Sequence, residues 1–252
     1  MKIAVISDIH GNLPALEAVL DDIARRQVDK TICLGDIIGK GPSSKEALDI
    51  CRANCDLIVQ GNWEAVLYNA YRVLREDTEA RVGDNFVWYV NDTGAERMEY
   101  LGNLPHSAEL YLSGKLVRLF HAHPINFNRY FADSPITQRL ELFGSPAASA
   151  ENRQSDVAVY ADIHNAYMQT LESKILINVG SVGNPLDMPQ ASYAILEGDE
   201  TRDSLSSFNV QLIKVPYDIA RAVALAEACC VPYLQEYIIE LTTSKYFDRG
   251  KK

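Results

Sequence analysis

The sequence predicts an α/β fold in which helices cover parallel strands. Short apolar runs rich in β-branched residues alternate with segments of helical periodicity over residues 1–59, and further strand and helix signals continue to residue 242. The chain has 252 residues, 47% hydrophobic and 23% charged, so it can bury a sizeable core and is neither disordered nor fibrous. It shows no repeat, linker or low-complexity tract, and we expect one domain spanning residues 1–252.

The first quarter of the chain carries a βαβαβ pattern. Asn12 can cap a helix, Pro14 lies in the first turn, and apolar residues recur at helical spacing from Leu13 to Ile23. A second helix is predicted over Lys45–Ala53, after a loop rich in Gly, Pro and Ser. This alternation is typical of parallel strands joined by helices. The three predicted strands are Ile3–Ile6, Thr31–Leu34 and Leu57–Val59.

A helical insertion follows at about residues 63–103. Next, two strand-like runs, Ala108–Leu112 and Leu116–Phe120, flank Ser113–Gly114 and predict a hairpin. Residues 126–156 carry little pattern beyond a short helix near Ile136–Phe143. The later predicted strands are Val157–Tyr160, Ala166–Leu171, Ile175–Val179, Ala191–Leu196 and Val210–Val215.

A pair of helices is predicted at about residues 218–242, divided by Pro232. This segment is rich in tyrosine, and Tyr217, Tyr233 and Tyr237 offer two readings. They either pack against the chain's own sheet, the commoner outcome, or form a contact in an oligomer.

The composition limits the classes of partner. The formal charge of −10 argues against binding to polymeric nucleic acid or to a membrane surface, since such affinity comes from Lys and Arg. There is no targeting signal and no apolar run long enough to span a membrane. The five cysteines form no CxxC pair, so we expect reduced thiols and a cytoplasmic location. An acidic chain that handles phosphates needs another positive charge, such as a metal.

Potential metal ligands stand directly after five of the predicted strands. Carboxyl ends of parallel strands meet at one edge of an α/β sheet, so these side chains can converge although they span more than half the sequence. Asp and Asn also follow strands simply as turn formers, but chance would be needed at every strand. Together they offer oxygen and nitrogen donors without thiolate, which suits Mn, Fe, Zn or Co, and they exceed the needs of one ion. They are Asp8, His10, Asp36, Asn62, His121, Asp162 and His164.

The order of these residues resembles the signature of calcineurin-like metallophosphoesterases, which reads DxH, GD, GNH(D/E), H and GHxH. The matching segments are Asp8–Asn12, Gly35–Asp36, Gly61–Glu64, His121 and Asp162–His164, and Asn178–Gly183 is similar to the NPGS(V/I)G segment of the small bacterial branch. The resemblance covers residues 1 to about 197. It extends to small bacterial phosphodiesterases, including streptococcal-type hydrolases of diadenosine tetraphosphate.

This resemblance implies a four-layer αββα sandwich of two mixed sheets with a two-metal site at one edge. Asp8, His10, Asp36 and His164 would hold one divalent ion, and Asp36, Asn62, His121 and Asp162 the other, with Asp36 bridging. Manganese is the predicted metal, with iron, zinc, cobalt and nickel as alternatives. A hydroxide shared by the ions would attack phosphorus.

Two positions depart from the family pattern. Trp63 stands where the family often has a histidine that assists the leaving group, so substrates with good leaving groups are favoured. Ala161–Asp162 replaces Gly–His. The shorter Asp162 side chain can ligate the same ions, but the second ion then shifts, binds more weakly, or is lost with the activity.

We therefore predict a metal-dependent phosphoesterase that acts on small phosphodiesters or nucleotide phosphoanhydrides. Predicted catalytic residues are Asp36, Asn62 and His123, where His123 replaces the missing acid unless it is an ordinary surface histidine. Predicted substrate contacts are Asn12, Trp63 and Arg129, although a packing aromatic is the commoner role for Trp63 and a surface residue the commoner role for Arg129. The alternatives are a weakened or inactive binding protein of the same fold, and a protein phosphatase.

Overall fold

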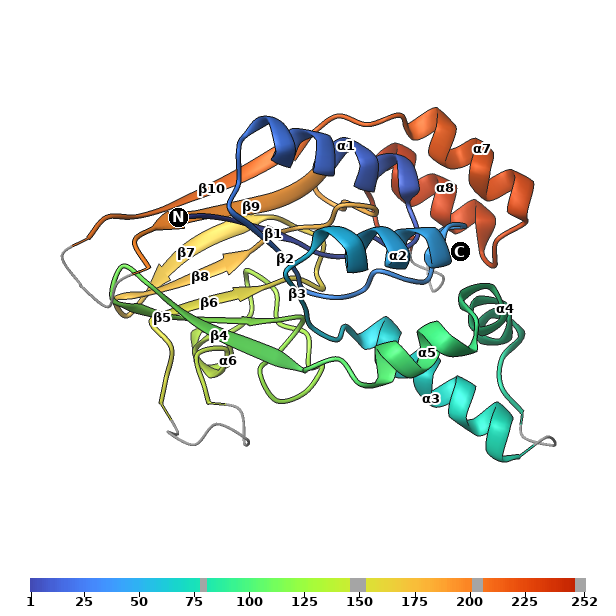
Figure 1. The fold of residues 1–252 in the computed structure, drawn as a ribbon, viewed down its shortest axis with the longest axis horizontal. Coiled ribbons are helices and arrows are strands. Elements are labelled where there is room, and N and C mark those ends of the chain that lie inside the picture. Colours follow the sequence, from blue (N-terminus) through green and yellow to red (C-terminus); the bar gives the residue numbers. More distant parts are fainter. Residues whose placement is uncertain (78–80, 146–152, 201–205, 248–252) are drawn as a thin grey trace.

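The computed structural model of the chain describes residues 1–77, 81–145, 153–200 and 206–247. Two five-stranded sheets pack against each other, and helices cover them (Figure 1). Among the described residues, no helix is long and apolar enough to cross a membrane. All five cysteines are free thiols.

The first sheet has the order β10-β9-β1-β2-β3. β1, β2 and β3 run parallel, and β9 lies antiparallel to both β1 and β10. The parallel part corresponds to the predicted βαβαβ unit. The strands are β1 (Lys2–Ile6), β2 (Lys30–Cys33), β3 (Leu57–Ile58), β9 (Ala191–Gly198) and β10 (Phe208–Val215).

The second sheet has the order β4-β5-β6-β8-β7 and is also mixed. β5, β6 and β8 are parallel, while the β4–β5 hairpin and the β7–β8 pair are antiparallel. Each sheet therefore contains three parallel strands. The strands are β4 (Ser107–Leu112), β5 (Lys115–Phe120), β6 (Val157–Tyr160), β7 (Tyr167–Leu171) and β8 (Lys174–Asn178).

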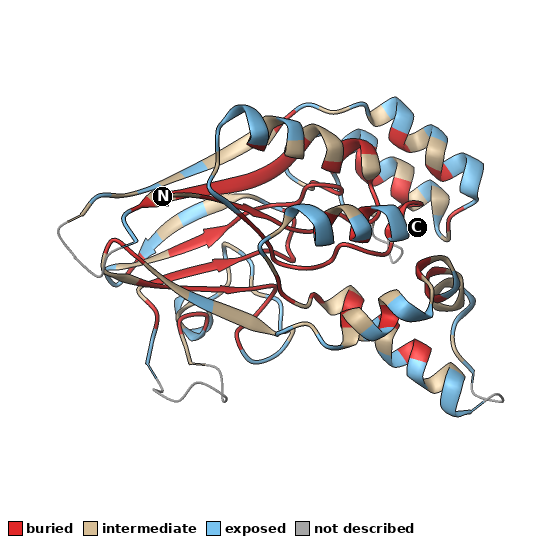
Figure 2. Cartoon of the chain, in the orientation of Figure 1, coloured by how far each residue is buried: buried red, intermediate tan, exposed pale blue. Residues whose placement is uncertain are grey.

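Alternating side chains of β1 supply two different cores, because neighbouring residues of a strand point to opposite faces. Ile3 and Val5 join the cluster between the two sheets. Ala4 and Ile6 face the helices on the outer side of the first sheet. These strand residues are fully buried, and the red interior of Figure 2 follows both sheets.

Helices lie on the outer face of the first sheet and beyond one of its ends (Figure 1). In α1, Asn12 accepts a hydrogen bond from Ala15 N at the helix start, as the sequence predicts. The Trp63-containing insertion forms three helices, and the C-terminal pair packs beside α1. The helices are α1 (Leu13–Arg25), α2 (Ser44–Asn54), α3 (Asn62–Glu76), α4 (Asp84–Thr93), α5 (Ala95–Gly102), α7 (Ile219–Cys229) and α8 (Leu234–Thr243).

The outer face of the second sheet has a thinner cover. The short helix α6 (Ile136–Glu141) and its flanking segment pack Leu142 and Phe143 on Phe120 and Tyr160. The predicted four-layer sandwich of two mixed sheets is thus confirmed. Residues 146–152, within the stretch with little sequence pattern, lie outside the described residues.

The C-terminal tyrosines divide between the two readings. Tyr237 is buried, and Tyr217 packs partly buried against the same cluster, formed by α7 and α8. Tyr233 is 46% exposed. Burial of two of the three rings within the chain favours packing over an oligomer contact.

Candidate metal centre

The loops after β1 and β2 run side by side and bring their polar residues together. Asp8 N donates to Gly35 O at 3.0 Å, and His10 N donates to Asp36 O at 2.9 Å. On the other side, Gly183 N donates to Asp8 O at 2.9 Å. Gly183 leaves no room for a side chain, since a Cβ there would lie 1.8 Å from Ile9 O. Backbone pairing therefore places these loops before any ligand binds.

Five of the seven predicted ligands adopt a left-handed backbone conformation. Such φ values are uncommon outside glycine, although Asp and His tolerate them better than most residues. Strained backbone of this kind persists only where surrounding contacts enforce it, and it clusters at functional sites. The residues are Asp8 (φ 52°), His10 (φ 48°), Asp36 (φ 50°), Asp162 (φ 65°) and His164 (φ 57°).

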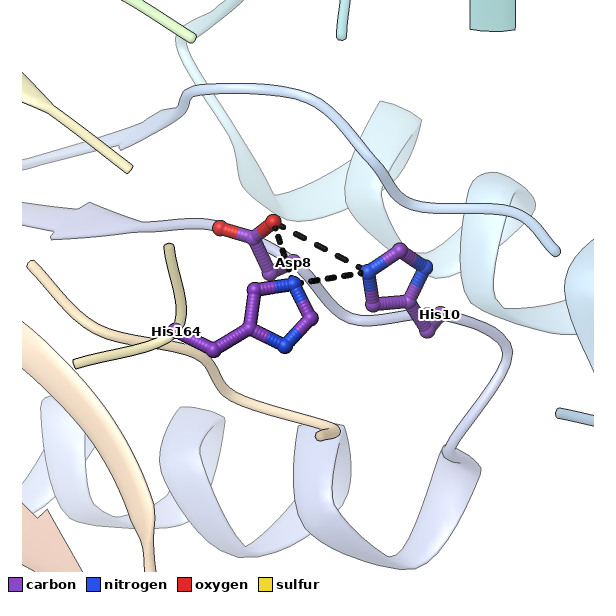
Figure 3. A group of neighbouring side chains, drawn as sticks. All are labelled: Asp8, His10 and His164. Atoms are coloured by element: carbon purple, nitrogen blue, oxygen red, sulfur yellow. Dashed lines mark hydrogen bonds and ion pairs between the residues drawn. The ribbon is translucent and has the colours of Figure 1, made fainter. Parts of the chain in front are cut away.

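One group of donors consists of Asp8, His10 and His164 (Figure 3). Asp8 Oδ1 lies 3.1 Å from His164 Nε2 and 3.8 Å from His10 Nε2. The two Nε2 atoms are 3.2 Å apart. All three residues are at most 5% exposed. Three ligand atoms from two separate strand ends thus surround one small space.

A second group consists of Asp8, Asp36 and His121. His121 Nε2 lies 3.4 Å from Asp36 Oδ2 and 3.9 Å from Asp8 Oδ1. Asp36 Oδ2 also lies 3.7 Å from His10 Nε2, so this carboxylate stands between the two groups. Its other oxygen accepts a hydrogen bond from Trp63 N, at the N-terminus of α3, at 2.8 Å. Helix N-termini favour negative charge, which helps to hold the carboxylate there.

The Asn62 amide completes the second group. Asn62 Oδ1 lies 2.9 Å from His121 Nε2 and faces only acceptor atoms. Turning the amide over would place its nitrogen 3.2 Å from Asp36 Oδ2 and 3.2 Å from Asp162 Oδ1. The oxygen-inward orientation is the one that a cation among these atoms would satisfy.

The three histidines share one orientation. Each Nδ1 faces a backbone carbonyl: Ile38 O for His10 at 3.3 Å, Leu34 O for His121 at 2.9 Å, and Asn184 O for His164 at 2.6 Å. A carbonyl only accepts hydrogen bonds, so Nδ1 carries a hydrogen, and in the neutral ring the Nε2 lone pair points into the site. This is how metal-binding histidines are usually held.

The electrostatics of the site show that its charges are mutually dependent. Burial would raise the pKa of Asp8, but His164, His121 and His10 hold it well below its usual value. Burial raises the pKa of Asp36. Burial opposes the charged form of His121, yet the carboxylates of Asp36 and Asp8 raise its pKa well above the usual value. Buried carboxylates therefore draw positive charge into the site.

These observations fit divalent metal ions. Asp8 Oδ1 is buried and has no hydrogen-bond partner in the structure, although three imidazoles surround it. An unpaired buried carboxylate oxygen is costly unless a cation binds it. Two Nε2 lone pairs at 3.2 Å would also repel each other without a cation between them. The donor set of carboxylate, imidazole and amide without thiolate suits Mn, Fe, Zn or Co.

Asp162 has a different partner from the one the sequence predicts. Arg129 Nε donates to Asp162 Oδ2 at 2.6 Å, and Arg129 Nη2 donates to Asp162 Oδ1 at 2.7 Å. Asp162 Oδ1 nevertheless lies only 3.8 Å from His121 Nε2. The predicted ligand is thus at the site, but a guanidinium already covers both of its oxygens.

Glu64 has a role that the sequence analysis missed. Its buried carboxylate accepts hydrogen bonds from Asp36 N (2.7 Å), Gly61 N (2.8 Å), Ile37 N (2.8 Å) and Ile38 N (3.3 Å). Glu64 therefore ties the loop that carries Asp36 to the start of α3. Burial, and then the Asp36 carboxylate, raise its pKa to about 7. A glutamate three residues after the residue that caps a helix was the available signal.

The donors open into a cavity of about 980 Å³. Its lining includes Asp36, Asn62, Asp162, His164 and the two predicted substrate contacts Trp63 and Arg129. Trp63 packs edge-on against His10 and Tyr89, with ring centroids 5.8 and 5.7 Å away. Gly39 lies so close that a Cβ there would be 2.1 Å from the indole. Trp63 thus both packs against the loop and borders the cavity.

Two predicted site residues lie elsewhere. The Asn12 side chain is buried, donates to Gly183 O at 2.7 Å and accepts from Ala15 N at 3.2 Å, so both of its polar groups are used within the chain. His123 is 5% exposed, and its Nδ1 accepts from Ile125 N at 3.2 Å. Neither residue is among the described residues that line the cavity. This geometry gives no support to their predicted roles.

The chain is similar in sequence to proteins of a family of phosphoesterases. Residues 1–201 match the calcineurin-like phosphoesterase superfamily domain. The chain is 34% identical to the uncharacterized protein MJ0912 of Methanocaldococcus jannaschii over 87% of this chain and 89% of the relative. It is 26% identical to the phosphodiesterase YfcE of Escherichia coli over 79% of this chain and 89% of the relative.

A solved structure shows the same fold. The metallophosphoesterase of Sphaerobacter thermophilus superposes with a TM-score of 0.71 at 23% identity, covering 97% of this chain and 100% of that chain. The ordered motifs, the converged donors and the match over residues 1–201 agree. The chain belongs to the calcineurin-like phosphoesterase superfamily and is an enzyme of the phosphoesterase class.

Proposed function

We propose that the chain hydrolyses small phosphodiesters or nucleotide phosphoanhydrides at a site with two divalent ions. Asp8, His10, His164 and Asp36 would hold the first ion, and Asp36, Asn62, His121 and Asp162 the second. Such ions lower the pKa of bound water and offset the charge of the phosphoryl oxygens. Manganese stays our predicted metal, and the cytoplasm our predicted location.

The observation that carries the proposal is the aromatic cavity directly beside the donors. A cavity of about 980 Å³ is large enough for a nucleoside or an aryl group next to the phosphate. Aromatic rings bind such groups by stacking. The Phe, Tyr and Trp residues of the lining are Trp63, Phe86, Tyr89, Phe131, Tyr233, Tyr237, Tyr246 and Phe247.

The charges of the cavity favour diesters over long polyphosphates. Its two described cations are already paired, Lys40 with Glu240 at 2.9 Å and Arg129 with Asp162. Apart from Arg129 once Asp162 binds an ion, additional phosphates would therefore meet no uncommitted positive charge on the described lining. A diester with one aromatic arm presents a single charge to the site and an uncharged ring to the cavity.

Leaving-group chemistry follows from Trp63. An indole cannot donate a proton to a departing oxygen, so the rate depends on the stability of the leaving group itself. We expect a bis-aryl phosphodiester to be hydrolysed faster than a dinucleoside tetraphosphate, and both faster than an alkyl phosphomonoester.

The test is a hydrolysis screen of these three substrates with the Mn²⁺-loaded protein. Asp8→Asn should lower hydrolysis by about tenfold or more, whereas Asp133→Asn, a matched change of an exposed carboxylate, should leave the rate unchanged. No hydrolysis of any substrate by a metal-loaded protein would reject the proposal in favour of a binding protein. Equal rates on all three would instead indicate a hidden acid, which His123→Ala would then identify.

A further inference from the structure

The guanidinium of Arg129 contacts Asp162, a predicted ligand of the second metal ion only. Arg129 contacts both oxygens of Asp162 through Nε and Nη2, at 2.6 and 2.7 Å. This two-nitrogen fork is the strongest geometry available to an arginine and a carboxylate. The Asp162 side chain is only 3% exposed, so little water competes for its oxygens.

Asp162 still belongs to the second donor group by position. Its Oδ1 lies 3.8 Å from His121 Nε2, and the Asn62 amide nitrogen would lie 3.2 Å from the same oxygen if the amide turned over. In the structure, the cation beside these atoms is Arg129. A metal ion at this position competes with the guanidinium, because both cations draw on the same carboxylate and repel each other at this distance.

The position of Arg129 allows its side chain to move away from Asp162. It lies on a segment between β5 and α6 that has no helix or strand, and its side chain is 47% exposed. The same side chain lines the cavity. It can therefore release Asp162 without disturbing either sheet.

We infer that Arg129 occupies the second metal position through its pair with Asp162 and is replaced there by a divalent ion. It occupies Asp162 when the chain holds one divalent ion, and it moves to the cavity when a second ion binds. The inference rests on the proposed metal centre. It predicts one tight ion, held by the Asp8, His10 and His164 group, and a second ion weakened by competition with Arg129.

The experiment is calorimetric titration of Mn²⁺ into the chelator-stripped protein. The unaltered chain should show a tight and a weak phase. Arg129→Gln should strengthen the weak phase by about tenfold or more, the scale expected for partners of metal ligands. It should leave the tight phase within about threefold. Urea unfolding checks that the variant is folded.

Lys40→Gln is the matched control. Lys40 lines the same cavity, but its Nζ contacts Asn184 Oδ1 and Glu240 Oε2 rather than a metal ligand. Its loss should change the weak phase by less than about threefold. An equal gain in both variants would show a general effect of charge and overturn the inference, as would no gain with Arg129→Gln.

A double-mutant cycle tests whether the effect acts through Asp162. Asp162→His supplies a neutral ligand that cannot form the two-oxygen pair with Arg129. In this background Arg129→Gln should produce no further gain. A gain of the same size would overturn the inference. Hydrolysis is read separately, so a chain with the expected two-phase binding but no hydrolysis would reject the proposed function alone.

Discussion

Replacing Glu64 with Gln should destabilise the protein although the two side chains have nearly the same shape. The Glu64 carboxylate accepts four backbone N–H groups, two on each oxygen. A glutamine can keep one oxygen in place, but its NH₂ group must then face the other two donors. Two buried N–H groups lose their acceptor as a result.

The magnitude follows from those two donors. A buried donor left without an acceptor costs about 1–3 kcal/mol, so two cost about 2–6 kcal/mol. Burial raises the pKa of Glu64 to about 7, which shows that its negative charge is itself unfavourable there. Glutamine removes that charge, so we expect the lower part of the range, about 2–4 kcal/mol.

The assay is urea unfolding followed by circular dichroism, with a chelator present so that metal affinity does not contribute. Glu76→Gln is the control, since Glu76 lies on the same helix, is 65% exposed and pairs with Arg72 across one turn. The control should unfold at the same urea concentration as the unaltered chain. A loss below about 1 kcal/mol for Glu64→Gln, with an unchanged denaturant slope, would refute the reasoning.

Three further predictions concern charge at the site and on the surface. Asp36→Asn should lower hydrolysis by on the order of a hundredfold or more, more than any other ligand change, because its carboxylate stands between both donor groups; a near-normal rate and metal content would refute bridging. Chelation should destabilise the chain, and Mn²⁺ at about 100 times its Kd should restore about 2.7 kcal/mol in urea unfolding; no change would mean that the donors bind no metal. Partial burial opposes the charged form of Asp22, but hydrogen bonds from Arg26 and Tyr193 lower its pKa in the folded chain. The charged Asp22 therefore stabilises the fold above its unfolded pKa, and this stabilisation is lost as the pH falls through its folded pKa. The stability difference between the unaltered chain and Asp22→Asn, measured by urea unfolding, should shrink from pH 5 to pH 3.

Much of the fold was accessible from local pattern. Strands such as Ile3–Ile6 are apolar on both faces because β1 lies between two cores, and a run of consecutive apolar residues in the sequence shows this directly. Helix starts were equally local, since Asn12 caps α1 through its own side chain. The stretch at 126–156 showed little sequence pattern, and its described part packs through scattered residues such as Phe143 rather than through a regular period.

The sequence by itself determined which chemical groups stand at the strand ends, because a ligand's type and its place after a strand are local facts. Only the tertiary structure decided how those groups meet. The sequence predicts Asp162 as a metal ligand, yet Arg129, 33 positions earlier, donates hydrogen bonds to both of its oxygens. The sequence predicts Asn12 as a substrate contact, yet its amide nitrogen donates a hydrogen bond to Gly183 O. Such pairings depend on how distant loops pack, and no period or spacing along the chain encodes them.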